Sequence, residues 1–252
     1  MTFASLSGQR ILITGSSSGI GRAMALECAR AGADIIINCR SSVDRATATA
    51  AEVRQFGVQA DVITADVGHP EGRSTLLQSA LSTGPLNALV CNAGADLLTT
   101  ELRNAPFPQK LKALLETDLT GTIELARAAG RHFRESGSGC ILTIGWDQSD
   151  RGMEGDSGEL FAAAKNAVMG FTRSLALSLA PLVRVNCIAP GWIRTAWGET
   201  ASEYWQQRVL QETPLKRWGE PHDIARLARF LLSSDAGFIT GQVLNVNGGA
   251  VR

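Results

Sequence analysis

The sequence has no excess of charge of either sign and no long hydrophobic segment. Its 24 lysines and arginines balance 24 aspartates and glutamates, so nothing favours a nucleic acid or an anionic membrane as a partner. No apolar run approaches the roughly 20 residues that a helix needs to cross a bilayer. The first residues, MTFASLSGQRILITG, carry no charged region ahead of an apolar one, so no signal peptide is expected. We therefore expect a cytoplasmic protein with no nucleic-acid or membrane partner.

Residues that commonly bind metals or form disulfides are scarce. The three histidines have no metal-ligand spacing relative to the cysteines, so no metal site is predicted. The cysteines are odd in number, widely separated and mostly within apolar runs, which favours buried reduced thiols over a disulfide framework. Tyrosine is scarcer still, since Tyr204 is the only one in the chain. The five cysteines are Cys28, Cys39, Cys91, Cys140 and Cys187.

Short β-branched runs alternate with helix-length segments along the chain. This alternation predicts an α/β fold with a doubly wound, mostly parallel, Rossmann-like sheet and helices on both faces. No repeat or linker divides the sequence, so residues 1–252 are expected to form one domain. The seven predicted strands are Arg10–Thr14, Asp34–Cys39, Val58–Thr64, Ala88–Cys91, Cys140–Ile144, Val183–Ile188 and Val243–Val246. The predicted helices lie at about 20–31, 43–56, 70–82, 107–136, 158–180 and 221–233.

Two segments depart from the regular alternation. The stretch 107–136 contains Gly121 and Gly130, so we expect two helices there or one bent helix. The segment from Pro190 to Pro214 is long for a connection between a strand and the last helix. Loops of that length in compact domains are usually lids or binding loops. We therefore expect a substrate lid at about residues 190–214.

A glycine-rich turn follows the first predicted strand and precedes a helix. Its spacing is Gly15-x-x-x-Gly19-x-Gly21. Glycines let the backbone approach a pyrophosphate closely, and the helix N-terminus supplies free N–H groups and a positive dipole end. The turn therefore predicts a dinucleotide site. The residues expected to bind the cofactor here are Gly15, Ser17, Ser18, Gly19, Ile20 and Gly21.

Further motifs fall in the order found in one known family. Together with the turn, they resemble the short-chain dehydrogenases/reductases over about residues 8–249. The resemblance implies that a carboxylate after the third strand contacts the adenine. It also implies that the Pro-Gly-x-x-x-Thr segment contacts the nicotinamide amide and the phosphates. The cofactor residues that it assigns are Asp66, Val67, Asn92, Ala93, Gly94, Lys165, Pro190, Gly191, Ile193 and Thr195.

The end of the second strand bears on the choice between NAD and NADP. NAD enzymes place a carboxylate here, which accepts hydrogen bonds from the ribose hydroxyls and repels a 2′-phosphate. This chain has Cys39 at that position, followed by Arg40 and Ser41. A guanidinium group can bind a phosphate through two hydrogen bonds. We therefore expect NADP, with NAD less favoured; the alternative is that Arg40 is a solvated loop arginine.

Most of the catalytic groups that the resemblance implies are absent. The family reduces carbonyls with an asparagine, a serine, a tyrosine that acts as the acid, and a lysine. Phe161 takes the place of the tyrosine in Tyr-x-x-x-Lys, and Lys165 remains. Trp146 or Gly145 takes the place of the serine, and Asp118 replaces the asparagine. The sequence thus keeps the cofactor motifs and loses three of the four groups that act on the substrate.

No other hydroxyl group clearly replaces the lost ones. Tyr204 lies far downstream of Phe161. Ser149 would require a loop adjustment, and Ser157 lies one helical turn before Phe161. The simpler interpretations are a loop residue for Ser149 and a helix N-cap for Ser157.

Asp118 and Trp146 have two interpretations each. Asp118 could pair with Lys165, because an unpaired buried ammonium group is costly, or it could lie at a helix N-terminus, where a carboxylate is favourable. Lys165 could still hold the ribose hydroxyls. Trp146 would either narrow the pocket beside the nicotinamide or offer a flat surface for stacking.

The segment after Trp146 is acidic. A solvated loop is the ordinary explanation, but a carboxyl group near an apolar pocket could have a raised pKa and supply the missing acid. Such a group could also bind a cationic substrate. Tyr204 and Trp205 in the lid are further candidates, unless they pack on the pocket rim. The acidic residues are Asp147, Asp150, Glu154, Asp156 and Glu159, with Arg151 as the only base.

These observations favour an NADP-dependent oxidoreductase with a non-standard proton donor. The lid carries Trp192, Trp197, Tyr204 and Trp205, which favours a small apolar or aromatic substrate. One alternative is a nucleotide-binding or regulatory protein that keeps the NADP pocket without catalysis. Another is a non-redox enzyme on the same scaffold.

The resemblance also implies a homo-oligomer, a dimer or a tetramer. The helices around 107–136 and 158–180 would then pack against a second subunit. A helical stripe fits such an interface, although a core-facing side explains it equally. The stripe comprises Phe161, Val168, Phe171 and Leu175.

Overall fold

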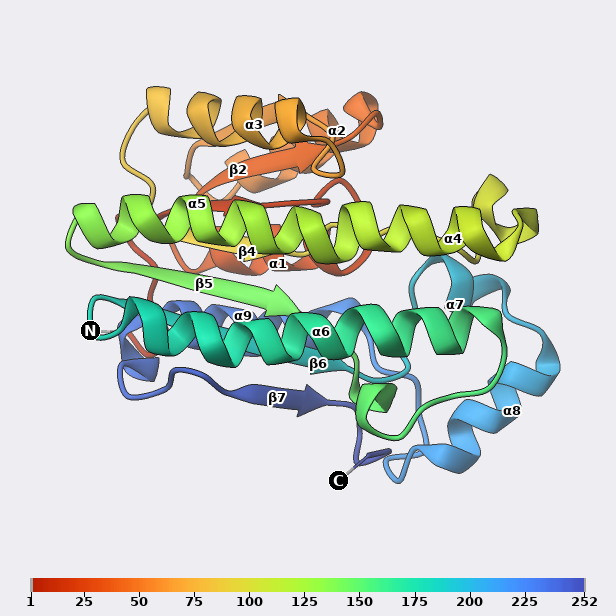
Figure 1. Ribbon diagram of the computed structural model, residues 1–252. Coiled ribbons are helices and arrows are strands. Elements are labelled where there is room, and N and C mark those ends of the chain that lie inside the picture. The colour runs from red at the N-terminus through yellow and green to blue at the C-terminus, as the bar shows by residue number, and fades with distance from the viewer. Residues whose placement is uncertain (1, 252) are drawn as a thin grey trace.

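Seven parallel strands form one sheet in the computed structural model, which describes residues 2–251. Their order is β3-β2-β1-β4-β5-β6-β7, which confirms the predicted doubly wound α/β sheet (Figure 1). All carboxyl ends therefore point to one edge, and the order reverses between β1 and β4, where such folds bind ligands. The strands are β1 (Arg10–Ile13), β2 (Asp34–Cys39), β3 (Ala60–Thr64), β4 (Ala88–Cys91), β5 (Gly139–Ile144), β6 (Val183–Pro190) and β7 (Val243–Val246).

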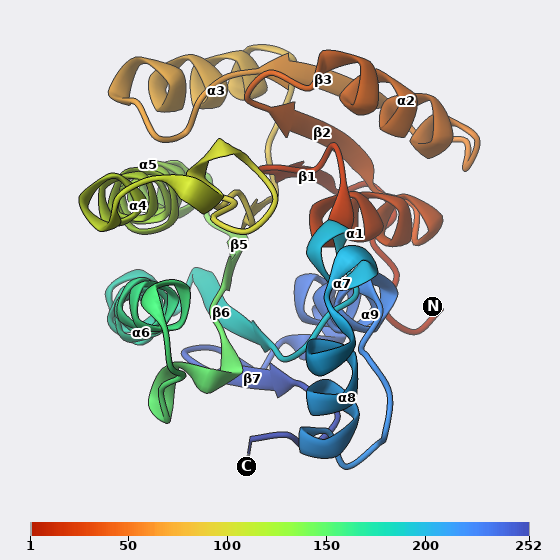
Figure 2. The same ribbon diagram turned by 90° about the vertical axis from the view of Figure 1, so that its right-hand side faces the viewer.

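Helices cover both faces of the sheet (Figure 2). Helices α1, α2 and α9 pack on one face, and α3, α5 and α6 pack on the other. Side chains along β1 alternate between the two layers, with Ile11 and Ile13 in the first core and Leu12 in the second. Such strands have no solvent side, which explains their nearly continuous apolar sequences. The helices are α1 (Gly19–Arg30), α2 (Val43–Arg54), α3 (Pro70–Ser82), α4 (Phe107–Leu114), α5 (Thr122–Glu135), α6 (Asp156–Leu179), α7 (Ala196–Thr200), α8 (Glu203–Glu212) and α9 (Pro221–Leu232).

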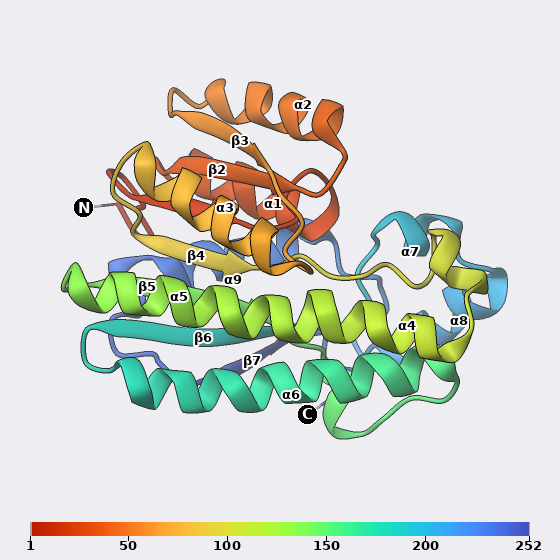
Figure 3. The same ribbon diagram turned by 45° about the horizontal axis from the view of Figure 1, so that its top comes forward.

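The long helical stretch after β4 contains one π-helical turn. This turn, η2 (Leu115–Gly121), joins α4 to α5, and the combined helix runs alongside α6 (Figure 3). The expected interruption therefore lies at 115–121 and not at Gly130, which is inside α5. A Cβ atom on Gly130 would lie 2.6 Å from Leu179 Cδ1 of α6. Gly130 thus allows two helices to approach closely and does not break one.

The segment expected to be a lid contains two helices. Both α7 and α8 lie at the carboxyl edge of the sheet (Figures 1 and 2). Four tryptophan rings pack together in and beside this segment, with ring centroids 5.6–6.4 Å apart in the pairs that touch. Trp197 belongs to α7 and Trp205 to α8, Trp192 precedes α7, and Trp218 follows α8.

Burial bears on the cysteines and on the helical stripe, and the described residues also bear on membrane spans and metal sites. All five cysteines are unpaired and buried, as predicted. Val168 and Leu175 of the helical stripe are buried in the core of this chain. Leu177 of the same helix, which is not part of the stripe, is 84% exposed. Within residues 2–251 no helix is long and apolar enough to cross a bilayer. In the same residues no three histidine, cysteine, aspartate or glutamate side chains gather as a metal site would require.

The element ends differ slightly from those predicted. Strand β3 begins at Ala60, because Gly57 adopts a positive φ of 80° in the preceding turn. Strand β6 continues to Pro190, so it extends two residues beyond the predicted end. Short helical turns occupy the remaining connections: η1 (Glu101–Asn104), η3 (Asp147–Asp150) and η4 (Ser234–Ala236).

Candidate active site

The three glycines of the turn between β1 and α1 are required by backbone conformation or by close packing. Gly15 and Gly19 have positive φ angles of 62° and 55°. A Cβ atom on Gly21 would lie 2.4 Å from the Gly15 carbonyl oxygen and 2.5 Å from Asn92 Nδ2. Glycine is therefore required at Gly21 by close packing, and at Gly15 and Gly19 by the left-handed backbone.

The N-terminus of α1 is open to an anion. Ser18 is the N-cap residue, and its side chain makes no capping hydrogen bond. The first N–H groups of α1 are thus available, and the positive end of the helix dipole favours a phosphate there. A Cβ atom on Gly19 would lie 3.8 Å from Thr195 Cγ2, so the segment before α7 lies over this turn. The residues present fit the pyrophosphate of a dinucleotide.

Hydrogen bonds fix the strand ends around this turn. Thr14 Oγ1 accepts hydrogen bonds from the backbone N–H groups of Asn92 and Ala93, both at 2.9 Å. The Asn92 side chain donates to the carbonyl oxygens of Thr14 (2.9 Å) and Gly15 (3.1 Å). Asn38 of β2 also holds this turn, since its Oδ1 accepts a hydrogen bond from the Gly15 N–H at 3.3 Å. Sequence analysis did not identify this residue. A polar residue within the apolar run of β2 was the available signal.

The residues expected to bind the adenosine half lie at the same edge. Arg40 and Ser41 are exposed just beyond β2, and Cys39 is buried. Arg40 forms no ion pair with any residue in the range 2–251. Asp66 follows β3, and its Oδ1 accepts the Gly68 N–H at 2.8 Å. The neighbouring residue, Val67, is buried.

Lys165 and Asp118 form a buried ion pair. Lys165 Nζ lies 2.9 Å from Asp118 Oδ2, and the side chains are 12% and 1% exposed. Asp118 Oδ1 also accepts the Ala95 N–H at 2.7 Å. Asp118 belongs to the π-helical turn within a continuous helix, so its interpretation as a helix N-terminal carboxylate is wrong. Pairing with Lys165 is the alternative that the geometry supports.

Phe161 lies beside Trp146. Their rings meet edge to face with centroids 6.3 Å apart. A Cβ atom on Gly145 would lie 2.8 Å from Met169 Cγ and 2.9 Å from Cys187 Sγ, so a side chain at position 145 would displace its neighbours. Of the two residues expected at the position of the family's serine, Trp146 is the one with space for a side chain, and that assignment stays a prediction.

The two alternative serines lie outside this ring pair. Ser149 is buried in η3, and its hydroxyl has no hydrogen-bond partner among the described residues. Asn166 of α6 donates to the Ser149 carbonyl oxygen at 3.3 Å, which fixes this turn. Ser157 lies in the first turn of α6, and Gly155 is the N-cap residue. The prediction that Ser157 is an N-cap is therefore wrong.

Asp147 is the one buried residue among the five acidic residues that follow Trp146. Its Oδ2 accepts a hydrogen bond from Asn247 Nδ2 at 3.0 Å, and its Oδ1 has no partner within residues 2–251. Burial raises the pKa of Asp147 to about 6, and the nearby Glu212 carboxylate adds to this effect. The carboxyl group thus keeps part of its protons near neutral pH. Sequence analysis gave no reason to choose Asp147 over its neighbours.

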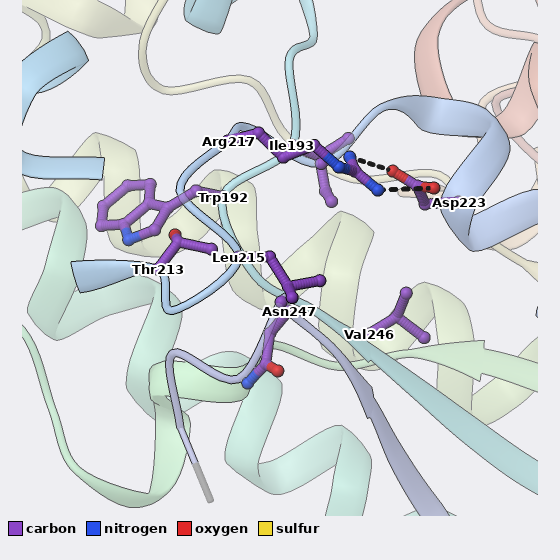
Figure 4. A pocket seen from close by; sticks show the side chains of 10 residues that line it. Trp192, Ile193, Thr213, Leu215, Arg217, Asp223, Val246 and Asn247 are labelled. Carbon is purple, nitrogen blue, oxygen red and sulfur yellow. Dashed lines mark hydrogen bonds and ion pairs between the residues drawn. The ribbon is translucent and has the colours of Figure 1, made fainter. Parts of the chain in front are cut away.

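Two cavities flank Trp192 at this edge of the sheet. One, of about 180 Å³, lies between the lid and the end of β7. Figure 4 shows Leu215 and Asn247 between Trp192 and an ion pair of Arg217 with Asp223. The other, of about 170 Å³, lies between α8 and the turn after β5. Side chains that line this second cavity include Gln148, Arg151, Met153, Trp192, Arg208 and Glu212.

The second cavity is more polar than the lid tryptophans suggested. Trp192, Trp197 and Trp205 pack on one another, and of the three only Trp192 lines this cavity. Arg208 links α8 to the acidic segment, since it pairs with Glu154 and with Glu212. Sequence analysis missed Arg208. The available signal was a basic residue four positions before an acidic one on the predicted lid.

A family model described as "Enoyl-(Acyl carrier protein) reductase" matches residues 15–251. The chain is 35% identical over 250 residues to a 3-oxoacyl-[acyl-carrier-protein] reductase from a Synechocystis species, and the match covers 98% of both proteins. It thus matches both a family model and a curated protein over nearly its whole length.

Solved structures of dehydrogenases are similar over nearly the whole chain. One is a 7α-hydroxysteroid dehydrogenase complexed with NADH and 7-oxo glycochenodeoxycholic acid, with a TM-score of 0.90 and 31% identity over 98% of this chain and 96% of the other. Another is a gluconate 5-dehydrogenase from Burkholderia cenocepacia in complex with NADP and tartrate, with a TM-score of 0.87, 31% identity and the same coverage. The two structures differ in the bound nucleotide and in the second bound molecule.

Replacing Asp147 by asparagine is expected to stabilise the fold at neutral pH. The pKa of Asp147 rises from 3.8 to about 6, so the folded chain holds a proton that the unfolded chain releases in this window. The contribution of Asp147 to the free energy of unfolding therefore falls as pH rises through the window. Asparagine has no charge to bury and still offers an oxygen to Asn247. We expect the variant to gain about 1–3 kcal/mol near pH 7.5.

Chemical denaturation near pH 7.5 and near pH 4 measures this difference, which should fall below about 1 kcal/mol at the lower pH, where the folded and unfolded chains differ little in protons bound. Asp150→Asn is the control, because Asp150 is exposed in the same turn. A less stable Asp147→Asn variant near pH 7.5 would contradict the expectation and show that the ionised carboxylate supports the fold.

Proposed function

Because this chain belongs to the short-chain dehydrogenase/reductase family of oxidoreductases, we propose that it uses NADP(H) and a proton donor other than the family's tyrosine. The observation that carries the proposal is the set of groups around Lys165. Lys165 pairs with Asp118, and the rings of Trp146 and Phe161, the residues that the resemblance assigns to the family's serine and tyrosine positions, meet edge to face.

The residues at the edge of the sheet would hold the cofactor in a defined way. The turn from Gly15 to Gly21 and the N-terminus of α1 would bind the pyrophosphate. Arg40 would bind the 2′-phosphate, since it is exposed and no carboxylate ends β2. The relatives with NADH and with NADP do not decide this choice. When bound, NADPH supplies a hydride to the substrate.

The remaining residues would act on the substrate in different ways. Lys165 lies 2.9 Å from Asp118 and would hold the ribose hydroxyls. Trp146 and Phe161 would exclude water and contact an apolar part of a small substrate. Asp147 is the candidate for the missing proton donor, because it is buried one residue after Trp146 and its pKa is about 6.

We propose that the chain forms a dimer or tetramer through α5 and α6. Leu177 of α6 supports this, since a leucine that is 84% exposed favours contact with another surface.

Replacing Arg40 by alanine should weaken NADPH binding and leave NADH binding nearly unchanged. The loss expected for NADPH is about 1.5–3 kcal/mol, the scale of a hydrogen bond to a charged group. Calorimetric titration with both nucleotides measures it, with the exposed Arg134→Ala on α5 as the control. An equal loss for both nucleotides would sink the assignment of Arg40 to the 2′-phosphate.

Restoring the family's groups should create ordinary carbonyl reduction. Phe161→Tyr alone places a phenol beside a lysine that Asp118 neutralises, so we expect little gain. The triple variant Phe161→Tyr, Asp118→Asn, Trp146→Ser should oxidise bound NADPH over a panel of simple ketones about 10²–10⁴ times faster than the natural protein, the usual value of general acid catalysis.

Single-turnover absorbance at the nicotinamide band measures this rate, and NADPH titration checks that each variant still binds. A triple variant that binds NADPH and gains nothing would mean that the pocket is shaped for another reaction. If Phe161→Tyr instead slows a reaction of the natural protein, another acid operates, and Asp147 is the first to test.

A further inference from the structure

We propose that Arg208 of α8 binds a carboxylate group of the substrate, and that the Glu154 carboxylate competes for the same place. This inference rests on the proposed function, because it names the substrate class of the same site. That class is small hydroxy or keto acids. Three observations support this class: contacts within α8 fix the Arg208 guanidinium, that guanidinium already binds the Glu154 carboxylate, and Arg208 lines the cavity beside Trp192.

Arg208 is fixed in position by its own helix. Its Nε donates to Glu212 Oε1 at 2.6 Å, and its guanidinium carbon lies 4.9 Å from the centre of the Trp205 ring. Glu212 is fixed in turn, since its Oε2 accepts the Trp192 Nε1–H at 3.1 Å. The side chain of Arg208 is 21% exposed. A guanidinium group held in this way loses little further freedom when it binds an anion.

The outer nitrogens of Arg208 hold a carboxylate from another part of the chain. Nη1 donates to Glu154 Oε1, and Nη2 donates to Glu154 Oε2 at 3.3 Å. Two nitrogens thus meet two oxygens, which is the fork geometry of arginine with a carboxylate. Hydrogen bonds from Arg208 lower the pKa of Glu154, so the glutamate stays ionised and competes at neutral pH.

Glu154 is held less firmly than Arg208. Its side chain is 70% exposed, and an exposed ion pair contributes little to stability. The flanking residues Gly152 and Gly155 have positive φ angles of 82° and 87°. Glycine allows the backbone to move between conformations at small cost. The Glu154 carboxylate can therefore leave Arg208 without disturbing a packed element.

Arg208 lines the cavity of about 170 Å³ beside Trp192, and Glu154 does not. A small acid in this cavity would meet the guanidinium directly. Exchange of one carboxylate for another leaves the charge around Arg208 and Glu212 unchanged, so no buried charge loses its partner. A neutral ligand offers no such exchange. The turn that forms one wall of the cavity begins just after Trp146, so the acid's carbon chain would extend toward the Trp146–Phe161 ring pair.

Binding of matched acids and esters tests the proposal. Lactate, 3-hydroxybutyrate and mandelate are titrated calorimetrically into the NADP-saturated protein, each beside its neutral methyl ester. We expect the preferred acid to bind at least about tenfold more tightly than its ester. Glu154→Gln should tighten acid binding about two- to fivefold, the scale of an exposed ion pair, and leave the ester unchanged. Arg208→Gln should weaken acid binding about 10- to 150-fold.

Two further variants separate recognition from folding. Arg208→Lys keeps the charge but loses the fork, and we expect intermediate acid binding with the thermal stability of the natural protein. Glu159→Gln is the matched control, since Glu159 is an exposed acid on the first turn of α6. Equal binding of acid and ester, no effect of Glu154→Gln, or no acid binding by any variant would overturn the proposal.

The outcomes distinguish this inference from the proposed function. Acid binding that depends on Arg208 in a protein that transfers no hydride, neither from these hydroxy acids to NADP nor from NADPH to the matching keto acids, would leave the carboxylate site standing and refute the redox role. NADP reduction by the hydroxy esters that is indifferent to Arg208 would do the reverse.

Discussion

The ion pair between Lys165 and Asp118 is the interaction on which the geometry of the site depends. It joins α6 to the π-helical turn η2, and the second oxygen of Asp118 holds the backbone of Ala95 after β4. A Cβ atom on Gly94 would lie 2.8 Å from Asp118 Oδ2, so the chain passes this carboxylate as closely as glycine allows. Both charges are buried, and removing either would leave the other uncompensated. Three segments from different parts of the sequence are therefore fixed together.

The lost catalytic groups form a coherent set around that pair. A phenol needs a neighbouring ammonium group to lower its pKa, and here Asp118 already neutralises that ammonium. Phe161 and Trp146 contact each other edge to face, and on the proposed function their rings would stand in place of two hydroxyl groups. The proposed cofactor residues are mainly glycines and backbone groups at the ends of β1, β4 and β6. The proposal thus assigns cofactor binding and proton transfer to largely separate residues.

The lid, which contains α7 and α8, is held together largely by its own contacts. Its three tryptophans, Trp192, Trp197 and Trp205, pack on one another, and Trp218 just after the lid packs on Trp197, so ring contacts connect α7 with α8. Charged groups then connect this unit to the rest of the chain, with Arg208 and Glu212 facing the turn after β5. The tryptophan rings pack the lid internally, whereas the ion pair of Arg208 with Glu154 can be exchanged for another carboxylate. The polar cavity between α8 and the turn after β5 favours a polar group on the ligand.

The sequence by itself determined the seven strands, their parallel order within βαβ units and the glycine-rich turn, because period and residue identity are local properties. It also determined that residue 161 has no hydroxyl group. Only the tertiary structure decided that Asp118 meets Lys165, since the phase of that helix depends on a π-helical turn. Gly121 indicated an interruption there but not its form. It likewise decided that Asp147 is buried while Glu154 is exposed and paired with Arg208. Burial and pairing of charges depend on which segments pack together, and that is a property of the folded chain alone.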